Sequence, residues 1–311
     1  MAFDGDENNS PEYNGLVAEA IAKFKSINVP YPPQVLFHAR CDYLQKLGLA
    51  NEEKPQMGLR ILAPSGSGKS TAALEYKAMV ERRTPPTDTF VPVLYIALDS
   101  ASTSKRLMVQ ILHALGDPLA ERGTEQALRK RAIDYLRRLG VQLLIIDEVQ
   151  HLSFRSTAKA DVTDALKSFL DAGVTPIVFA GTEDARRMFE SNLQLNGRLL
   201  APLDMPKLES SKSEDRNLFA SFVWGLCDGM CERKVLKTSS SIVGEGVLGP
   251  LMEVTDGVVG RVARLFEVAI EIAIRRGSNT LEVADLSLAV DRWAIPQNFA
   301  KRNPFRARGK K

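Results

Sequence analysis

The chain has 311 residues, of which 44% are hydrophobic and 25% are charged, with 41 basic and 38 acidic side chains. This composition excludes a disordered or collagen-like chain, and the length suits one large domain or two of ordinary size. The longest apolar stretches, such as 141–146, are far shorter than the roughly 18 residues that a membrane-spanning helix requires.

The N-terminus and the cysteines predict a cytoplasmic protein with no membrane attachment. The first twelve residues contain four acidic side chains and no apolar core, which is unlike a secretory signal. The cysteines form an odd, sparse set, which suits a reducing compartment and not a disulfide framework. They are Cys41, Cys227 and Cys231.

Charge is distributed unevenly along the chain, although its net value is only +3. The last eleven residues contain six basic and no acidic side chains, whereas the first ten contain three acidic ones. A basic tail of this kind is typical of an arm that binds nucleic acid or an acidic partner. It is equally typical of a solvated chain end.

The N-terminal two thirds of the chain have the pattern of an α/β domain. Helices are predicted at 14–26 and 34–49, on either side of a proline-rich joint at 29–34 that should be extended. Farther on, short β-branched runs alternate with longer amphipathic segments. The predicted strands are 59–62, 93–98, 142–146 and 176–180, and the predicted helices are 69–83, 104–115, 124–139 and 158–172. This alternation predicts a parallel sheet with helices on both faces.

After residue 206 we expect helices only. The periodic segments are 213–232, 239–254, 260–276 and 280–292, and Thr280 is the expected cap of the last one. The expected parts of the chain are an N-terminal segment at 1–33, an α/β domain at 34–205, a helical domain at 206–295 and a basic tail at 296–311.

Residues 63–70 read APSGSGKS and lie between a predicted strand and a predicted helix. Gly66 and Gly68 allow a tight turn whose backbone N–H groups face a phosphate, at the positive end of the helix dipole. We expect Lys69 to bridge the β- and γ-phosphates of ATP and Ser70 to ligate Mg²⁺. The nucleotide-contacting residues would be Pro64, Ser65, Gly66, Ser67, Gly68, Lys69, Ser70 and Thr71. A glycine-rich turn with a chance lysine is the alternative, which the flanking elements disfavour.

An acidic pair, Asp147 and Glu148, ends the apolar run LLIID. Asp147 would reach the carboxyl edge of the sheet beside the phosphate loop and hold Mg²⁺ through water. Glu148 would orient and polarise the water that attacks the γ-phosphate. The alternative is an ordinary solvated loop. The strand at 93–98 lies between these two motifs in sequence, as in the additional-strand division of P-loop proteins.

Three further positions are candidates for sensing the nucleotide. Thr182 follows the fourth strand and would touch the γ-phosphate or the water, unless it only closes a turn. Arg198 is the candidate for an arginine that reaches the nucleotide of a neighbouring subunit, with Arg186 and Arg187 as competitors. Arg261 in the helical domain would couple the nucleotide to domain closure, although Arg264 lies one turn away.

The phosphate loop, DEVQHL at 147–152, Gly-Thr at 181–182, GRL at 197–199 and GVVGR at 257–261 together resemble the AAA+ ATPases. Within that class, the DEVQHL motif, the VFAGTEDA motif at 178–185 and the compact size resemble the TniB/TnsC group of transposition ATPases. The resemblance covers roughly residues 30 to 295. It implies a core with a five-stranded parallel sheet, followed by a small all-α lid. Ala63 departs from the glycine usual in the loop, and the role of the basic tail cannot be inherited.

The resemblance also implies partners. Such proteins assemble with ATP as rings or helical filaments on double-stranded DNA, recruit a DDE-type transposase and a TniQ-like targeting protein, and are released upon hydrolysis. The sequence agrees in that no separate Ser/His/Asp or metal-ligating constellation is evident.

Contact with DNA would be independent of base sequence and made through backbone phosphates. The first candidate is the loop at 100–106, whose polar side chains are Ser102, Thr103, Ser104, Lys105 and Arg106. The cluster at 129–131 and the tail come second, and a solvated charged face is the alternative for each.

Two other functions remain open. One is a switch or remodelling ATPase that acts on a protein partner, with ATPase activity indifferent to DNA. The other is a relative of replication initiators or helicase loaders. That class ordinarily carries a winged-helix DNA reader after the lid, and about 20 residues follow position 292, too few for a domain.

Overall fold

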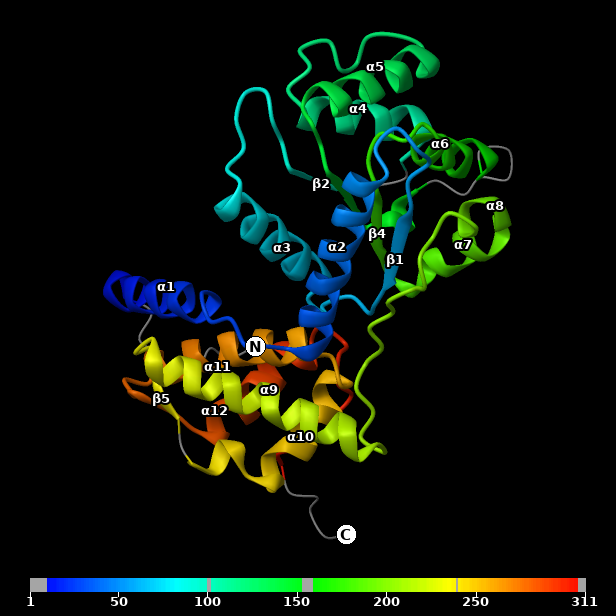
Figure 1. Cartoon of the computed structure of the whole chain (residues 1–311). Coiled ribbons are helices and arrows are strands. Elements are labelled where there is room, and N and C mark those ends of the chain that lie inside the picture. The colour runs from blue at the N-terminus through cyan, green and yellow to red at the C-terminus, as the bar shows by residue number, and fades with distance from the viewer. Residues whose placement is uncertain (1–9, 100–101, 153–158, 239, 307–311) are drawn as a thin grey trace. The chain divides into compact units, whose positions relative to one another are not determined.

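The structure, a computed structural model, describes residues 10–99, 102–152, 159–238 and 240–306 (Figure 1). These residues form two compact units. One unit comprises residues 32–206, and the other combines residues 10–31 with residues 207–306. None of the described helices is both long enough and apolar enough to span a membrane.

The first unit is built on a parallel sheet with the order β1-β4-β3-β2 (Figure 1). Its strands are β1 Gly58–Leu62, β2 Val93–Ala97, β3 Leu143–Asp147 and β4 Ile177–Gly181. Each lies within a residue or two of its predicted position. β1 and β2 are the two outer strands of the sheet, and β4 and β3 lie between them. The carboxyl ends of β1, β4 and β3 are therefore neighbours at one edge.

The expectation of a fifth strand is wrong, since the sheet of the described residues has four. Residues 198–205 run along the free edge of β1, where Leu200, Leu203 and Met205 donate their N–H groups to carbonyls of β1 at 2.8–2.9 Å. A regular ladder would use every second residue, but Pro202 has no N–H to donate. The chain therefore has one extra residue between the first two donors, and the regular pairing is lost. The Asp204 carboxylate accepts instead from the Leu62 N–H at 3.2 Å.

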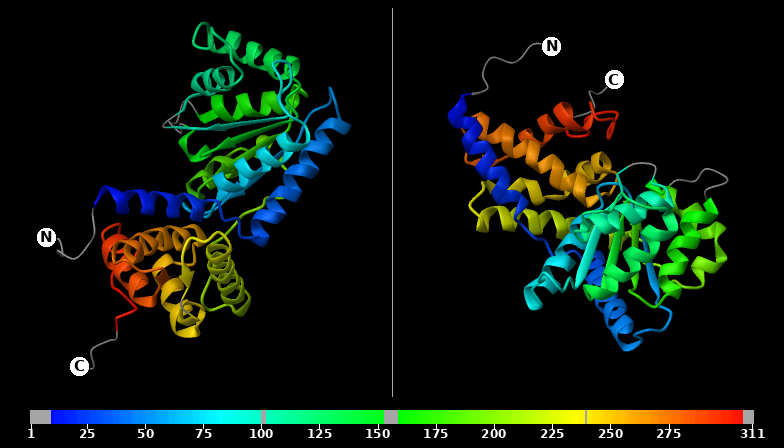
Figure 2. Two further views of the ribbon diagram at one scale, coloured as in Figure 1. Left: turned by 90° about the vertical axis from the view of Figure 1, so that its left-hand side faces the viewer. Right: turned by 90° about the horizontal axis from the view of Figure 1, so that it is seen from above.

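Helices cover both faces of this sheet (Figure 2). On one face, α2 Pro32–Ala50 and α3 Lys69–Arg83 pack on the odd-numbered residues of β2 and β3. On the other face lie α4 Ser104–Ala114 and α6 Lys159–Asp171, with α5 Glu125–Arg138 packed on α4. Strands buried on both faces explain the continuous apolar runs in the sequence.

Short elements follow the last two strands at the carboxyl edge. They are the 3₁₀ turns η1 Val149–His151 and η2 Glu183–Ala185 and the helices α7 Arg186–Ser191 and α8 Leu193–Asn196. Phe189 of α7 packs edge-on against Phe179 of β4, with ring centroids 5.8 Å apart. This contact anchors the segment that leads away from β4.

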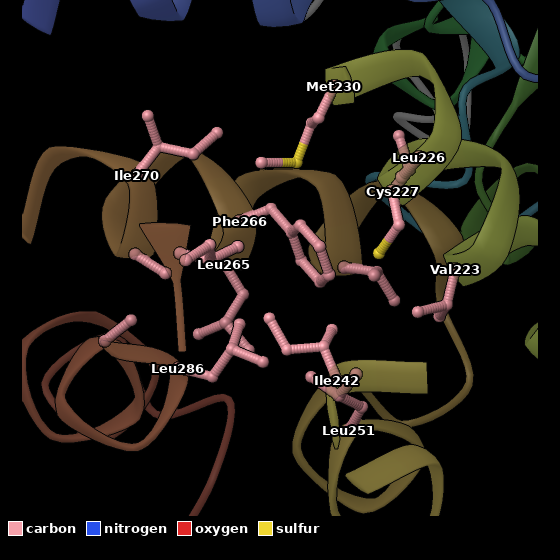
Figure 3. Packing of buried hydrophobic residues seen from close by; sticks show 14 of the residues in the cluster. Val223, Leu226, Cys227, Met230, Ile242, Leu251, Leu265, Phe266, Ile270 and Leu286 are labelled. Carbon is pink, nitrogen blue, oxygen red and sulfur yellow. The ribbon is translucent and has the colours of Figure 1, made fainter. Parts of the chain in front are cut away.

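The second unit is a helical bundle around one apolar core. Its main helices are α9 Ser213–Glu232, α10 Glu245–Thr255, α11 Val259–Arg275 and α12 Val283–Ala289, which a π-helical turn Val290–Ala294 extends, and a 3₁₀ turn Ser240–Val243 precedes α10. Figure 3 shows Phe266 of α11 among Val223 and Cys227 of α9 and Leu251 of α10. These side chains are at most 3% exposed.

The expectation that strands stop at residue 206 is also wrong. A two-stranded parallel sheet joins β5 Lys237–Thr238 to β6 Thr280–Leu281. Because Thr280 pairs in this ladder, it does not cap α12. Glu282 is the cap, in a reciprocal box in which Asp285 accepts the Glu282 N–H at 2.8 Å.

The N-terminal helix α1 Pro11–Lys25 packs within the helical unit and not as a separate segment. Phe24 stacks on Phe266 of α11, with centroids 6.5 Å apart. The chain then passes over two glycines of α9, which give room to Ile27 and Val29. The proline-rich joint is shorter than predicted, since α2 begins at Pro32. Proline is tolerated in the first turn of a helix because its missing N–H has no partner there.

Candidate functional site

The phosphate loop joins the carboxyl end of β1 to the start of α3. Gly66 and Gly68 have φ angles of 79° and 88°, a region in which only glycine is unstrained. Gly68 directly precedes α3, and a Cβ atom there would lie 2.8 Å from Nε2 of Gln34 on α2. The loop thus closes tightly against α2 while its N–H groups gather at the N-terminus of a 15-residue helix.

Lys69 is the first residue of α3 and is only 5% exposed. Its Nζ donates to the carbonyl oxygens of Ala63 and Pro64, both at 3.3 Å. Burial lowers the pKa of Lys69, and the nearby carboxylates of Glu148 and Asp147 act in the opposite direction. The ammonium group therefore lies inside the loop and within electrostatic reach of the acidic pair.

The donor set of the loop fits a phosphate. The buried Ser67 Oγ has no hydrogen-bond partner among the described residues, and a buried polar group without a partner costs about 1–3 kcal/mol. A phosphate oxygen would satisfy this hydroxyl. The first turn of α3 carries no acidic residue, so nothing there opposes a bound anion.

Asp147 ends β3, is fully buried, and has both carboxylate oxygens engaged. Oδ1 accepts the backbone N–H of Glu148 at 2.8 Å, and Oδ2 accepts the hydroxyl of Tyr95 at 2.8 Å. Together with the Ser70 hydroxyl, this carboxylate offers the hard oxygen ligands that Mg²⁺ prefers. Within the described ranges no three His, Cys, Asp or Glu residues form a metal cluster. One carboxylate plus substrate phosphates is a usual Mg²⁺ environment.

Glu148 points in a different direction from Asp147 because its backbone is left-handed, with φ 59° and ψ 39°. Its Oε2 accepts a short hydrogen bond from Nε2 of Gln150. The Oε1 of Gln150 accepts the backbone N–H of Thr182 at 3.0 Å. Since a backbone N–H can only donate, the amide orientation of Gln150 is fixed and its NH₂ faces Glu148.

Thr182 follows β4, the strand between β1 and β3. Its hydroxyl donates to Asp184 at 3.2 Å. Gly181 before it lies so close to η1 that a Cβ atom would be 2.7 Å from Val149 Cγ2 and 2.9 Å from Gln150 Oε1. The structure thus brings the phosphate loop, the acidic pair and Thr182 to one edge of the sheet.

Tyr95 and Gln150 are the contacts that sequence reasoning missed. Tyr95 reaches Asp147 from β2, and Gln150 links Glu148 to Thr182 after β4, so no spacing along the chain reveals these links. Once β2 is placed beside β3, the register sets Tyr95 opposite Ile145 and Ala97 opposite Asp147, which is the signal that could have pointed to Tyr95.

The candidate arginines of the first unit lie at different edges. The carbonyl of Arg198 accepts the N–H of Gly58 at the amino end of β1, and its Nε donates to Asp171 at 2.6 Å. Arg198 is therefore remote from the phosphate loop of its own chain. Arg186 pairs with Glu183 and Asp204 near the carboxyl end of β1. Arg187 is exposed.

In the helical unit, the Arg261 guanidinium lies 4.7 Å from the ring centre of Phe299, a cation–π contact. Its Nη1 donates to the Thr255 carbonyl at 3.4 Å. Arg264 pairs with Glu267 on the surface of α11. The role of Arg261 toward the nucleotide stays a prediction.

Only part of the loop proposed for DNA contact is exposed. Ser102 is fully buried, so its hydroxyl is not a surface donor. The prediction that Ser102 contacts DNA is therefore wrong. Thr103 caps α4 by accepting the N–H of Arg106 at 3.3 Å, and Arg106 pairs with Asp99 at 2.7 Å. Lys105 is exposed and forms no ion pair with another described residue. Residues 100–101 lie outside the described ranges.

The remaining candidates for DNA contact are mostly paired as well. Ser104 donates to Glu125 at 2.6 Å, and Arg129 pairs with the same carboxylate at 3.1 Å. Arg131 pairs with Asp117, which leaves Lys130 as the exposed cation of that cluster. In the tail, Arg302 and Arg306 pair with acidic residues of the helical unit. Residues 307–311 lie outside the described ranges.

Several solved structures share the fold of this chain. Orc1 of Aeropyrum pernix in complex with DNA matches with a TM-score of 0.63 and 17% identity over 86% of this chain and 66% of that chain. Orc2 of the same organism, solved with ADPNP and ADP, matches at 0.58 and 14% over 82% and 67%. Domain III of DnaA from Thermotoga maritima matches at 0.53 and 17% over 92% and 98%.

These similarities, the parallel sheet and the phosphate loop define the fold as that of the AAA+ class. The family model described as Bacterial TniB protein matches residues 37–209, more than half of the chain. The chain therefore belongs to the TniB family. No relative among curated proteins matches the sequence.

Proposed function

We propose that the protein is an ATP-dependent regulator of DNA transposition. In this proposal it binds Mg²⁺-ATP, oligomerises on double-stranded target DNA, recruits a DDE-type transposase and a TniQ-like targeting protein, and is released when ATP is hydrolysed. The observation that carries the ATPase part is the convergence of the buried Lys69 with Asp147 and Glu148 at one sheet edge. Membership of the TniB family supports the transposition part.

Binding would rest on the loop. Lys69 would exchange its two carbonyl contacts for phosphate oxygens, which carry full negative charge and bind an ammonium group more strongly. The N–H groups at the start of α3 would hold the β-phosphate. Ser70 and Asp147 would hold Mg²⁺, which supplies charge neutralisation at the phosphates when bound.

Hydrolysis needs an acceptor for a water proton. Glu148 would accept a hydrogen bond from that water and orient its oxygen toward the γ-phosphorus. A bond forms between the water oxygen and phosphorus while the bond to the β–γ bridging oxygen breaks, which yields ADP and inorganic phosphate. Thr182, held beside Glu148 by Gln150, would complete this edge of the site.

DNA contact would be made through phosphates, by exposed cations such as Lys105 and Lys130. Arg198 is our candidate for the arginine that reaches the nucleotide of a neighbouring protomer, because it lies away from the phosphate loop of its own chain. Its surface pair with Asp171 is 39% and 35% exposed, so exchanging that partner costs little.

The central experiment compares Lys69→Ala with wild type. Removing one partner of a buried charge pair costs at least about 2 kcal/mol, or roughly 30-fold in affinity. We expect at least that loss in ATP affinity, measured with a fluorescent analogue. Light scattering with duplex DNA should show no ATP-dependent assemblies of the variant.

Lys77→Ala is the matched control, since Lys77 lies on the same helix and its half-buried side chain pairs with Glu81. Normal ATP-dependent assemblies of Lys69→Ala would refute the site. Wild-type ATPase activity that is indifferent to DNA, with no salt-sensitive DNA binding, would favour a remodelling ATPase that acts on a protein.

A further inference from the structure

We propose that Tyr95 is a positioning residue for the metal site, because its hydroxyl fixes the carboxylate of Asp147 from the neighbouring strand. The inference rests on the proposed function, in which Asp147 holds Mg²⁺. It adds a residue of β2 to a site otherwise built from the phosphate loop and the ends of β3 and β4.

The contact follows from strand register. Tyr95 lies directly opposite Ile145, and Asp147 lies two residues farther along β3 on the same face. A diagonal neighbour of this kind is within reach of a long aromatic side chain. The residue directly opposite Asp147 is Ala97, whose small side chain leaves that space open. The Tyr95 hydroxyl thus reaches Asp147 Oδ2 at 2.8 Å.

Two donors restrain the carboxylate of Asp147. The Glu148 N–H holds Oδ1 and the Tyr95 hydroxyl holds Oδ2, so rotation of the carboxylate about its last torsion would break both hydrogen bonds. Each oxygen keeps a second lone pair for the metal or its water. Groups that orient a metal ligand in this way commonly change metal affinity by about 10- to 100-fold when removed.

Tyr95 is also suited to the task chemically. Its hydroxyl also forms a hydrogen bond with Ser70. Its contact with Ser70 means that one hydroxyl group touches both side chains assigned to Mg²⁺.

The test is Tyr95→Phe, which keeps the ring packed against α3 and removes only the hydroxyl. Mn²⁺ binding would be measured by electron paramagnetic resonance, with the protein saturated by a non-hydrolysable ATP analogue. We expect the variant to bind Mn²⁺ about 10-fold more weakly. Its affinity for the analogue in EDTA should stay within about twofold of wild type, because the phosphate loop is intact.

Tyr76→Phe is the matched control. Tyr76 belongs to the same apolar cluster, and its buried hydroxyl donates to Gln45 at 2.6 Å, away from the acidic pair. It should lose some thermal stability and keep its Mn²⁺ affinity. In an Asp147→Asn background, Tyr95→Phe should have little further effect, since the hydroxyl acts through that carboxylate.

Unchanged Mn²⁺ affinity in Tyr95→Phe would overturn the inference and leave the proposed function standing. An equal loss in Tyr76→Phe, or an equal loss of nucleotide affinity in EDTA, would also overturn it, because either result indicates general loosening of the fold. Failure of the wild-type protein to bind the nucleotide at all would refute the proposed function, and this inference with it.

Discussion

Two adjacent carboxylates have opposite surroundings at the end of β3. Asp147 is fully buried and held by two donors, whereas Glu148 leaves the strand in a left-handed conformation and meets the amide of Gln150. The left-handed residue turns the second side chain away from the first. One carboxylate can therefore serve the metal while the other serves the water, although they are neighbours in sequence.

Glu148→Gln tests this division. The variant keeps the size of the side chain but cannot accept a proton from water, so ATP hydrolysis should fall by about 100-fold or more. ATP affinity should change little, because Lys69 and the loop are untouched. Single-turnover hydrolysis and analogue binding measure the two quantities separately. Turnover close to that of wild type would exclude Glu148 as the group that orients the water.

At the scale of elements, close packing of small residues decides how the N-terminal segment is held. A Cβ atom on Gly225 would lie 2.5 Å from Val29, and one on Gly229 would lie 2.4 Å from Ile27. These residues are one turn apart on α9 and leave a shallow track for the chain. β-branched side chains cannot move aside easily, since their rotamers are restricted.

Gly229→Ala should therefore destabilise the protein by about 1–3 kcal/mol, the usual cost of overpacking. Gly246→Ala on α10 is the control, because a Cβ atom there meets nothing within 4 Å. That change should stabilise by about 0.5–1 kcal/mol, since alanine favours a helix. Urea unfolding measures both, and equal effects would show that Gly229 is not held against Ile27.

At the scale of the whole molecule, the chain passes twice between the two units, at 31–32 and at 206–207. The helical unit thus contains both the N-terminal helix and the C-terminal helices. In the proposed function a second protomer completes the nucleotide site, since Arg198 lies at the amino edge of the sheet, away from its own phosphate loop.

Mixing two inactive variants tests that dependence. Arg198→Ala lacks the proposed trans arginine, and Glu148→Gln lacks the water-orienting group but should still bind ATP and assemble. An equal mixture should recover up to about a quarter of the wild-type ATPase rate, since random neighbours combine an intact Glu148 with an intact Arg198 at that share of interfaces. Arg187→Ala in place of Arg198→Ala should be active by itself. A mixture no more active than its components would place the arginine elsewhere.

The sequence by itself determined the parts that depend on local pattern. Alternating runs predicted four strands and the helices between them, because apolar periodicity follows from which face of an element is buried. The loop motif predicted the glycines, Lys69 and Ser70, since phosphate binding needs those residue types in that order. The acidic pair was predicted for the same reason.

The tertiary structure alone decided everything that depends on a neighbour distant in sequence. Pro202 breaks the pairing of a fifth strand only because its segment lies against β1. Thr280 does not cap α12, because it pairs with β5. Burial removes Ser102 from the surface. Tyr95 reaches Asp147 because β2 lies beside β3. Strand order and burial arise from long-range packing, which local periodicity does not encode.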